Sequence, residues 1–145
     1  MKGHISENFT WEEFEYSDKA IALGIENIIP DEGIAAQIRS LVLSVLQPLR
    51  TACGHALHLN SGYRCAKLNK AVKGAKNSQH TKGQAADIAA SDPLALAKLV
   101  IELNLPFDQM ILYGDFVHIS HKAEGPQRGQ ILYDESYTGQ KLTQQ

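Results

Sequence analysis

The sequence is poor in cysteine, with only Cys53 and Cys65 among its 145 residues. One bridge between them would be optional, because a chain of this length buries roughly 68–70% of the surface that its unfolded form exposes. We therefore expect both thiols to be reduced and the core to form without disulfides. For the same reason we expect any bound metal to be functional rather than structural.

Long apolar runs and clustered positive charge are also missing. No stretch approaches the ~18 uninterrupted apolar residues of a membrane helix, and residues 1–14 carry acids and aromatics where a secretory signal has an apolar segment. Lys and Arg number 14 against 16 Asp and Glu, for a net charge of −2, with the two signs mixed along the chain. We expect no membrane insertion, no nucleic-acid partner and, without a signal peptide, cytoplasmic synthesis.

No repeat, low-complexity tract or long linker divides the chain. We therefore expect one domain over residues 1–145, a monomer, with a frayed tail from about residue 134. The N-terminal third is predicted to be helical in short pieces. Thr10 and Glu13 have the spacing of a capping box, and Ser17 can cap a second turn that ends near Gly24.

The main core helix is predicted from residue 34 to just before Gly54. Spacings of three and four place its apolar residues on one face: Ile34, Ile38, Leu41, Val42, Val45, Leu46 and Leu49. This face should supply a core that does not depend on a metal.

Strands are predicted mainly in the C-terminal half. Alternating residues predict a strand that starts at Leu57, and small residues predict a strand over residues 84–90. A helix with Pro93 at its first position is predicted to follow. Residues 109–113 and 116–120 are separated by two residues, the spacing of a tight hairpin, and residues 130–133 can add an edge strand. The order favours an α+β fold, a small antiparallel sheet with helices packed on one side.

Histidine is the residue type that stands out, with six in the chain. His80 lies in a predicted loop and Asp87 on the strand that follows, so the chain can bring the two side chains together. On residues 116–120, His118 faces away from Val117 and Ile119. Imidazole and carboxylate ligands suit zinc, and three protein ligands with one open position are typical of catalytic zinc. Each residue alone is more often a hydrogen-bonded or surface group.

The other candidate residues are weaker. His4, His55 and His121 are expected to be exposed, and His58 to face away from Leu57 and Leu59. None of the four is expected to bind metal. Three aromatic residues are interpreted as packing residues: Trp11, Phe14 and Tyr63. Cys65 could be taken for a nucleophile, but no histidine is known to lie near it. A catalytic cysteine is also the weaker hypothesis because the sequence offers a complete set of candidate metal ligands.

The motifs as a set resemble those of a known family in order and spacing. They are Ser61-Gly62-Tyr63-Arg64, Leu68-Asn69, Ser78-x-His80-x-x-Gly83-x-Ala85-x-Asp87 and Asp115-x-x-His118. The sequence is similar here to the zinc D-Ala-D-Ala carboxypeptidase and L-alanyl-D-glutamate endopeptidase family. Asn8-Phe9-Thr10 with Glu13 and Ser17, and Phe107-Asp108-Gln109 with Arg128, extend the resemblance over nearly the whole chain.

The resemblance implies a hedgehog-like fold with the zinc ligands lining the sheet. The implied ligands are His80, Asp87 and His118, and the implied substrate-binding residues are Arg64, Ser78 and Gln109. It also implies that Asp115 is the acid/base residue and that Arg64 polarises the scissile carbonyl. Zinc lowers the pKa of a bound water to about 7, and a positioned carboxylate can then exchange its proton.

Strand geometry constrains the role of Asp115. Residues three apart on a regular strand face opposite sides, so Asp115 and His118 cannot both face the site from one strand. Asp115 must belong to the turn, where Gly114 would take a positive φ and re-aim the carboxylate. The alternatives are an ordinary turn aspartate, a solvated Arg64 and a Ser78 hydroxyl that closes a local turn.

The resemblance implies a zinc peptidase that cleaves peptidoglycan stem peptides, either as a D-Ala-D-Ala carboxypeptidase or as an endopeptidase. Without a signal peptide, we expect a phage or prophage lysin that acts at the wall after release or export. The alternatives are a non-catalytic binding module that retains the metal and a structural zinc domain. Loops over residues 72–77 and 122–128 are expected to set bond specificity.

Overall fold

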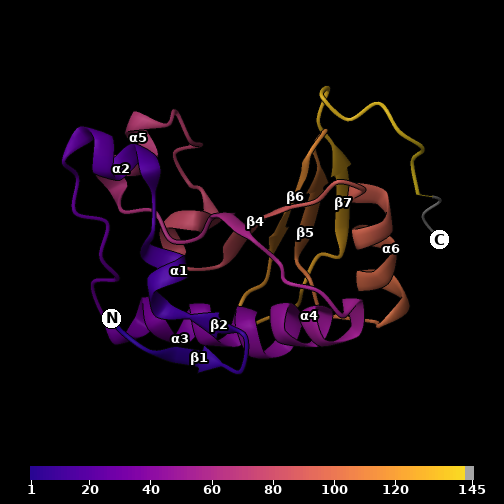
Figure 1. Ribbon diagram of the computed structural model, residues 1–145, viewed down its shortest axis with the longest axis horizontal. Coiled ribbons are helices and arrows are strands. Elements are labelled where there is room, and N and C mark those ends of the chain that lie inside the picture. Colours follow the sequence, from indigo (N-terminus) through magenta and orange to yellow (C-terminus); the bar gives the residue numbers. More distant parts are fainter. Residues whose placement is uncertain (143–145) are drawn as a thin grey trace.

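The computed structural model describes residues 1–142 and places a five-stranded sheet over one long helical segment (Figure 1). In spatial order the strands are β3 (Leu59–Ser61), β4 (Ala85–Ala89), β6 (Phe116–Ser120), β5 (Gln109–Leu112) and β7 (Gln130–Tyr133). Neighbouring strands are antiparallel except β5 and β7, which are parallel. The mixed α and β architecture agrees with the predicted class.

The predicted edge strand exists, but the sheet is not wholly antiparallel. Gln130 at the start of β7 pairs with Gln109 at the start of β5. Both residues lie at the end of the sheet where β6 finishes. Because β7 starts where β6 ends, it runs opposite to β6 and therefore along β5. A second sheet, β1 (His4–Ser6) and β2 (Phe9–Thr10), lies in the N-terminal segment that was expected to be helical only.

Local capping signals define the first helices as predicted. Thr10 and Glu13 form a complete capping box at the start of α1 (Trp11–Glu15). Ser17 accepts a hydrogen bond from the Ala20 N–H at the start of α2 (Asp18–Leu23), which ends at Gly24. Later along the chain, Asp92 caps α6 (Pro93–Glu102) in the same way.

The predicted main helix is one helical segment with a π-helical turn inside it. It consists of α3 (Glu32–Leu41), the π turn Val42–Leu46 and α4 (Gln47–Cys53), and it ends at Gly54 with φ +76°. Pro48 explains the π turn, because proline has no N–H and its ring crowds the carbonyl four residues earlier. The Gln47 N–H instead donates to the Val42 carbonyl, five residues back.

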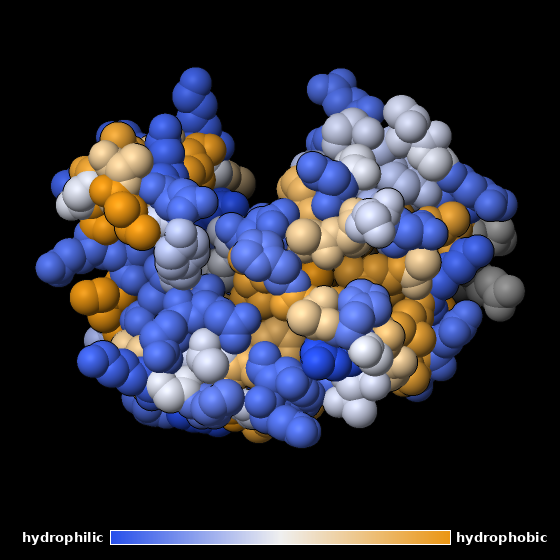
Figure 2. Space-filling view, in the orientation of Figure 1, coloured by the Kyte–Doolittle hydropathy of each residue, from blue (hydrophilic) through white to orange (hydrophobic). Residues whose placement is uncertain are grey.

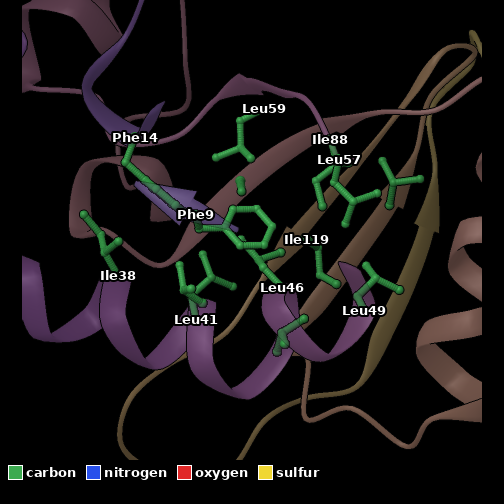
Figure 3. Close-up of a cluster of buried hydrophobic side chains, with 14 of the residues drawn as sticks. Phe9, Phe14, Ile38, Leu41, Leu46, Leu49, Leu57, Leu59, Ile88 and Ile119 are labelled. Atoms are coloured by element: carbon green, nitrogen blue, oxygen red, sulfur yellow. The ribbon is translucent and has the colours of Figure 1, made fainter. Parts of the chain in front are cut away.

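The apolar face of this segment packs against one face of the sheet (Figure 3). Seven buried sheet residues face it: Ala86, Ile88, Met110, Leu112, Val117, Ile119 and Leu59. The three residues interpreted as packing residues are all buried: Trp11, Phe14 and Tyr63. The core therefore forms between the long helical segment and the sheet, away from the predicted metal ligands.

Cys53 and Cys65 are free thiols, as expected. Tyr137 and Leu142 of the predicted frayed tail pack against the core, and residues 143–145 of that tail lie outside the described residues. Within residues 1–142, no helix combines the length and the apolar character needed to cross a bilayer.

Candidate metal centre

Three elements bring the predicted ligands together. Asp87 and His118 lie directly opposite each other in the antiparallel pairing of β4 with β6. His80 lies in the 3₁₀ turn Gln79–Lys82 just before β4. Gly83 ends this turn with φ +74°, and a Cβ there would come within 2.8 Å of the Ile34 carbonyl oxygen. Glycine at this position lets the turn fold back over the sheet.

The ligand atoms of the three residues all lie within 4.8 Å of one another. Nε2 of His80 is 3.2 Å from Oδ1 of Asp87, and Nδ1 of His118 is 2.8 Å from the same oxygen. His80 and Asp87 are buried and His118 is partly buried. This donor set, two imidazole nitrogens and one carboxylate, is the set from which catalytic zinc sites are built.

The hydrogen bonds of His80 show that a proton or a metal ion lies between its ring and Asp87. Its Nδ1 lies 2.7 Å from the Gly62 carbonyl oxygen, which only accepts, so Nδ1 must carry a hydrogen. In the neutral ring, Nε2 then presents a lone pair toward the Asp87 carboxylate, which is also an acceptor. Two acceptors at this distance need a proton or a metal ion between them. A proton makes Nε2 a donor to Asp87, and a zinc ion would take the place of that proton, so the residues fit a zinc site.

Asp87 is prepared as an anionic ligand. Burial acts to raise its pKa, but the hydrogen bonds from His118 and His80 outweigh burial and hold the pKa far below its ordinary value. The group is therefore a carboxylate at neutral pH, as metal binding requires.

Arg64 is fixed beside the ligands, and the alternative of a solvated surface arginine is wrong. Its side chain is only 16% exposed, and Nη2 lies 3.6 Å from Oδ2 of Asp87. Nε donates to the Ser61 hydroxyl and Nη1 to the Asn69 amide oxygen. Burial lowers the pKa of Arg64, an effect that Asp87 opposes, and a guanidinium remains charged at neutral pH in either case.

The ligands and Arg64 line a depression of about 540 Å³. Its walls come from the loop after α5 (Ala66–Ala71), from the 3₁₀ turn and from β5 and β6. Figure 2 shows the surface hollowed between the lobe that contains α2 and α5 and the lobe formed by the ends of the central strands. Ser78 and Gln109, the other predicted substrate-binding residues, also line it. The Ser78 hydroxyl accepts from the His80 N–H, so it closes the local turn as well.

Asp115, the predicted acid/base residue, does not line the depression with the three ligands. It lies in the turn before β6, as strand geometry predicted, but it is exposed and is not among the residues that line the depression. The expectation of a positive φ at Gly114 is wrong. Glycine is needed there for another reason, because a Cβ would come within 2.9 Å of the Ser136 carbonyl oxygen.

Tyr113 lines the depression and was not predicted to do so. Ile111 lies opposite His118, and Tyr113, two residues further on, points to the same side of the sheet. Its ring stacks on Phe116 at 4.1 Å between centroids. Burial, then the charge of Asp87, raise the pKa of Tyr113, so its phenol is a hydrogen-bond donor at neutral pH. The hairpin register would have revealed this residue.

Asp108 and Arg128 form a second polar pair at the rim of the depression. Nη2 of Arg128 lies 2.8 Å from Oδ2 of Asp108, whose side chain is 1% exposed. Burial acts to raise the pKa of Asp108, but the Arg128 hydrogen bonds lower it to about 2. Only the family resemblance pointed to these residues in the sequence, because they are twenty positions apart.

Of the remaining histidines, His4 and His55 are exposed as predicted, and His58, which was predicted to face away from Leu57 and Leu59, is exposed too. His121 is buried, so its predicted exposure is wrong. Its Nδ1 donates to the Pro106 carbonyl at 2.6 Å, and its Nε2 lies 2.8 Å from the Ser40 hydroxyl. The end of β6 passes below α3, which explains why both nitrogens are used in structural hydrogen bonds.

Comparison with known proteins gives one finding. The sequence model of the family described as Peptidase M15 matches residues 7–120, a range that includes Arg64 and all three residues of the metal cluster. The search of curated proteins gives no match.

Proposed function

The chain belongs to the peptidase M15 family, and from this premise we propose that it is a zinc-dependent peptidase that hydrolyses an amide bond in peptidoglycan stem peptides. The observation that carries the proposal is the convergence of His80, Asp87 and His118 in a depression next to a fixed Arg64. A site used only to stabilise the fold would not need a partly buried arginine beside it.

His80, Asp87 and His118 would hold the zinc ion. When bound, zinc supplies Lewis acidity toward a peptide carbonyl and makes a nucleophilic water available at neutral pH. The protein keeps His80 in the required tautomer through the Gly62 carbonyl. It also keeps Asp87 ionised through its two histidine neighbours.

Arg64 would stabilise the negative charge that develops on the scissile carbonyl oxygen. Ser61 and Asn69 hold two of its nitrogens, so the guanidinium is oriented before substrate binds. Donors that need no reorganisation, in a site partly shielded from water, are the most effective at this task. The resemblance and the position of Arg64 next to Asp87 support the same role.

On the resemblance, we assign the acid/base role to Asp115. The alternative is Tyr113, because it lines the depression. Replacement of Asp115 by Asn should lower kcat by about 10²–10⁴-fold, because a positioned proton acceptor is lost. Replacement of Tyr113 by Phe keeps the stacked ring and should leave kcat within about threefold. Steady-state kinetics on a stem peptide decides, and the reverse pattern would assign the role to Tyr113.

The activity itself is tested on purified peptidoglycan. Zinc-loaded protein should release new free amines, and mass spectrometry of the fragments from a defined stem peptide should identify the cleaved bond. The matched control is the His118→Ala variant. If no amines form while atomic absorption shows one zinc per chain, the protein is the non-catalytic binding module instead.

We further propose a role as a phage or prophage lysin. It predicts that added protein clears bacteria whose outer barrier has been permeabilised. If the protein cleaves purified peptidoglycan but the turbidity of the bacteria stays unchanged, the lysin role is contradicted and the peptidase activity still holds.

A further inference from the structure

The geometry points to Arg128, anchored by the buried Asp108, as the residue that binds a free carboxylate of the peptide substrate. This inference rests on the proposed function, because it concerns the same depression. It adds a substrate-recognition subsite at Arg128, which lies in the loop after β6 and lines the depression.

Asp108 holds the guanidinium of Arg128 by one edge. Nε and Nη2 of Arg128 donate to Oδ2 of Asp108 at 3.1 and 2.8 Å, and the Arg128 backbone N–H donates to Oδ1. Gln79, next to His80, donates to the same carboxylate at 3.2 Å. Nη2 also donates to the Gln79 amide oxygen at 3.5 Å. Among the described residues, none accepts a hydrogen bond from Nη1 of Arg128, and the side chain is 52% exposed. The guanidinium is thus oriented by Asp108 and Gln79, and its Nη1 donors remain available.

The charges around Asp108 do not cancel. Lys122 Nζ lies 3.7 Å from Oδ1 of Asp108, so one carboxylate has two cationic neighbours. Arg128 lines the depression and Lys122 does not. One positive charge in excess therefore remains at this rim.

The depression as a whole is positively charged. Three cations line its walls: Arg64, Lys73 and Arg128. Within the described part of the chain, Asp87 is the one acidic residue on these walls, and its charge is directed at the metal site. Such a cleft attracts anions and rejects peptides with a cationic group at this position.

A carboxylate is the anion that fits both the guanidinium and the proposed substrate class. The planar guanidinium offers parallel donors that match a carboxylate better than a lysine does. A stem peptide carries two such groups, the C-terminal carboxylate and the α-carboxylate of its isoglutamyl residue. The same chemistry would recognise either, so the experiment has an arm for each.

The test measures binding of three synthetic peptides to the zinc-loaded full chain by titration calorimetry, and hydrolysis separately. The parent peptide is L-Ala-D-isoGlu-L-Lys-D-Ala-D-Ala; the second has a C-terminal carboxamide and the third has isoglutamine in place of isoglutamate. One of the two modified peptides, in which a carboxamide replaces a carboxylate, should bind the wild type about tenfold more weakly than the parent peptide does. That peptide identifies the carboxylate that Arg128 binds.

The protein variants assign the effect to Arg128. Arg128→Gln should weaken binding of the parent peptide by about tenfold and leave binding of the sensitive carboxamide unchanged. Lys122→Gln is the matched control, because it removes a neighbour of Asp108 that does not line the depression, and it should bind all three peptides as the wild type does. Arg128→Lys should recover part of the loss.

The outcomes separate the two proposals. Equal binding of all three peptides to the wild type would overturn the subsite, whether or not Arg128→Gln folds. A loss in Arg128→Gln that is the same for every peptide would also overturn it, because a structural role does not discriminate between ligands. If the pattern holds but no peptide is cleaved, the subsite stands and the proposed hydrolysis fails.

Discussion

The two faces of the five-stranded sheet differ in role: one packs in the apolar core, and the other presents the candidate metal ligands. On β4, Asp87 lies between Ala86 and Ile88, and on β6, His118 lies between Val117 and Ile119. The four apolar neighbours are buried in the core against the long helical segment. Asp87 and His118 instead form the metal cluster with His80.

This arrangement separates stability from chemistry. Because side chains alternate along a strand, a shift of one residue would exchange the two faces. The apolar face therefore fixes the register that places Asp87 opposite His118. The core can hold the polar cluster in place without a contribution from the metal, so changes on one face should affect one property and leave the other.

The largest expected effect is loss of the metal on the polar face. His118→Ala should lower zinc affinity by about 100-fold or more and reduce hydrolysis to the level without enzyme. Zinc content and amine release measure the two effects. His58→Ala is the control, because His58 is exposed and outside the cluster. Unchanged zinc content in His118→Ala would show that the site does not use this residue.

The next effect concerns the apolar face. Leu46 is fully buried in the helical segment, and Leu46→Ala should lower the free energy of unfolding by about 2–5 kcal/mol. Urea unfolding measures this change, while the zinc stoichiometry of the folded variant should stay at one. Leu43→Ala is the matched control, because Leu43 is 53% exposed on the same segment, and it should cost less than about 0.5 kcal/mol. Loss of zinc binding in the folded Leu46 variant would contradict the separation.

A smaller effect tests whether the rim of the polar face contributes to stability. The pKa of Asp108 is about 2 in the folded protein against an ordinary 3.8, so its contribution is present above pH ~4 and is lost as the pH falls through about 2. Because Arg128 is half exposed, we expect only about 1 kcal/mol.

Urea unfolding of the wild type and Asp108→Asn at several pH values measures this contribution. The wild type should be the more stable protein at pH 7, and the difference should shrink between pH ~4 and ~2. Glu124→Gln, an exposed change in the loop that contains Arg128, should show no such trend. A difference that does not depend on pH would mean that Asp108 acts through packing.

The smallest expected effect is that of chelation on the fold. Removal of metal should leave the far-ultraviolet circular dichroism spectrum unchanged, because the helical segment and the apolar sheet face form a core independent of the cluster. A melt with and without chelator measures it. Collapse of the spectrum at room temperature would instead identify a structural zinc domain.

Local patterns predicted a large part of this structure. The capping box of Thr10 and Glu13 and the cap at Asp92 depend on neighbours within three residues, so the sequence reveals them directly. Strand alternation made His80, Asp87 and His118 candidate ligands, the family resemblance named them as a set, and the structure brings the three together.

Other features depend on contacts between distant residues. The buried His121 needs Ser40, 81 positions earlier in the chain, and the Asp108 and Arg128 pair joins two loops. The β1 and β2 pair and the parallel β7 also went unpredicted, since short strands carry little periodicity and pairing direction is set by where the connection returns.

The sequence by itself determined the apolar helical face and the hairpin, because each depends on periodicity or on close spacing, and the family resemblance of its motifs named the candidate metal ligands. The tertiary structure alone decided which polar groups share the depression. It placed Tyr113 and Arg128 on its walls and left Asp115 exposed in the turn. The physical reason is that the direction of a side chain in a loop depends on the contacts of that loop, such as Asp108 with Arg128 and Gly114 with Ser136.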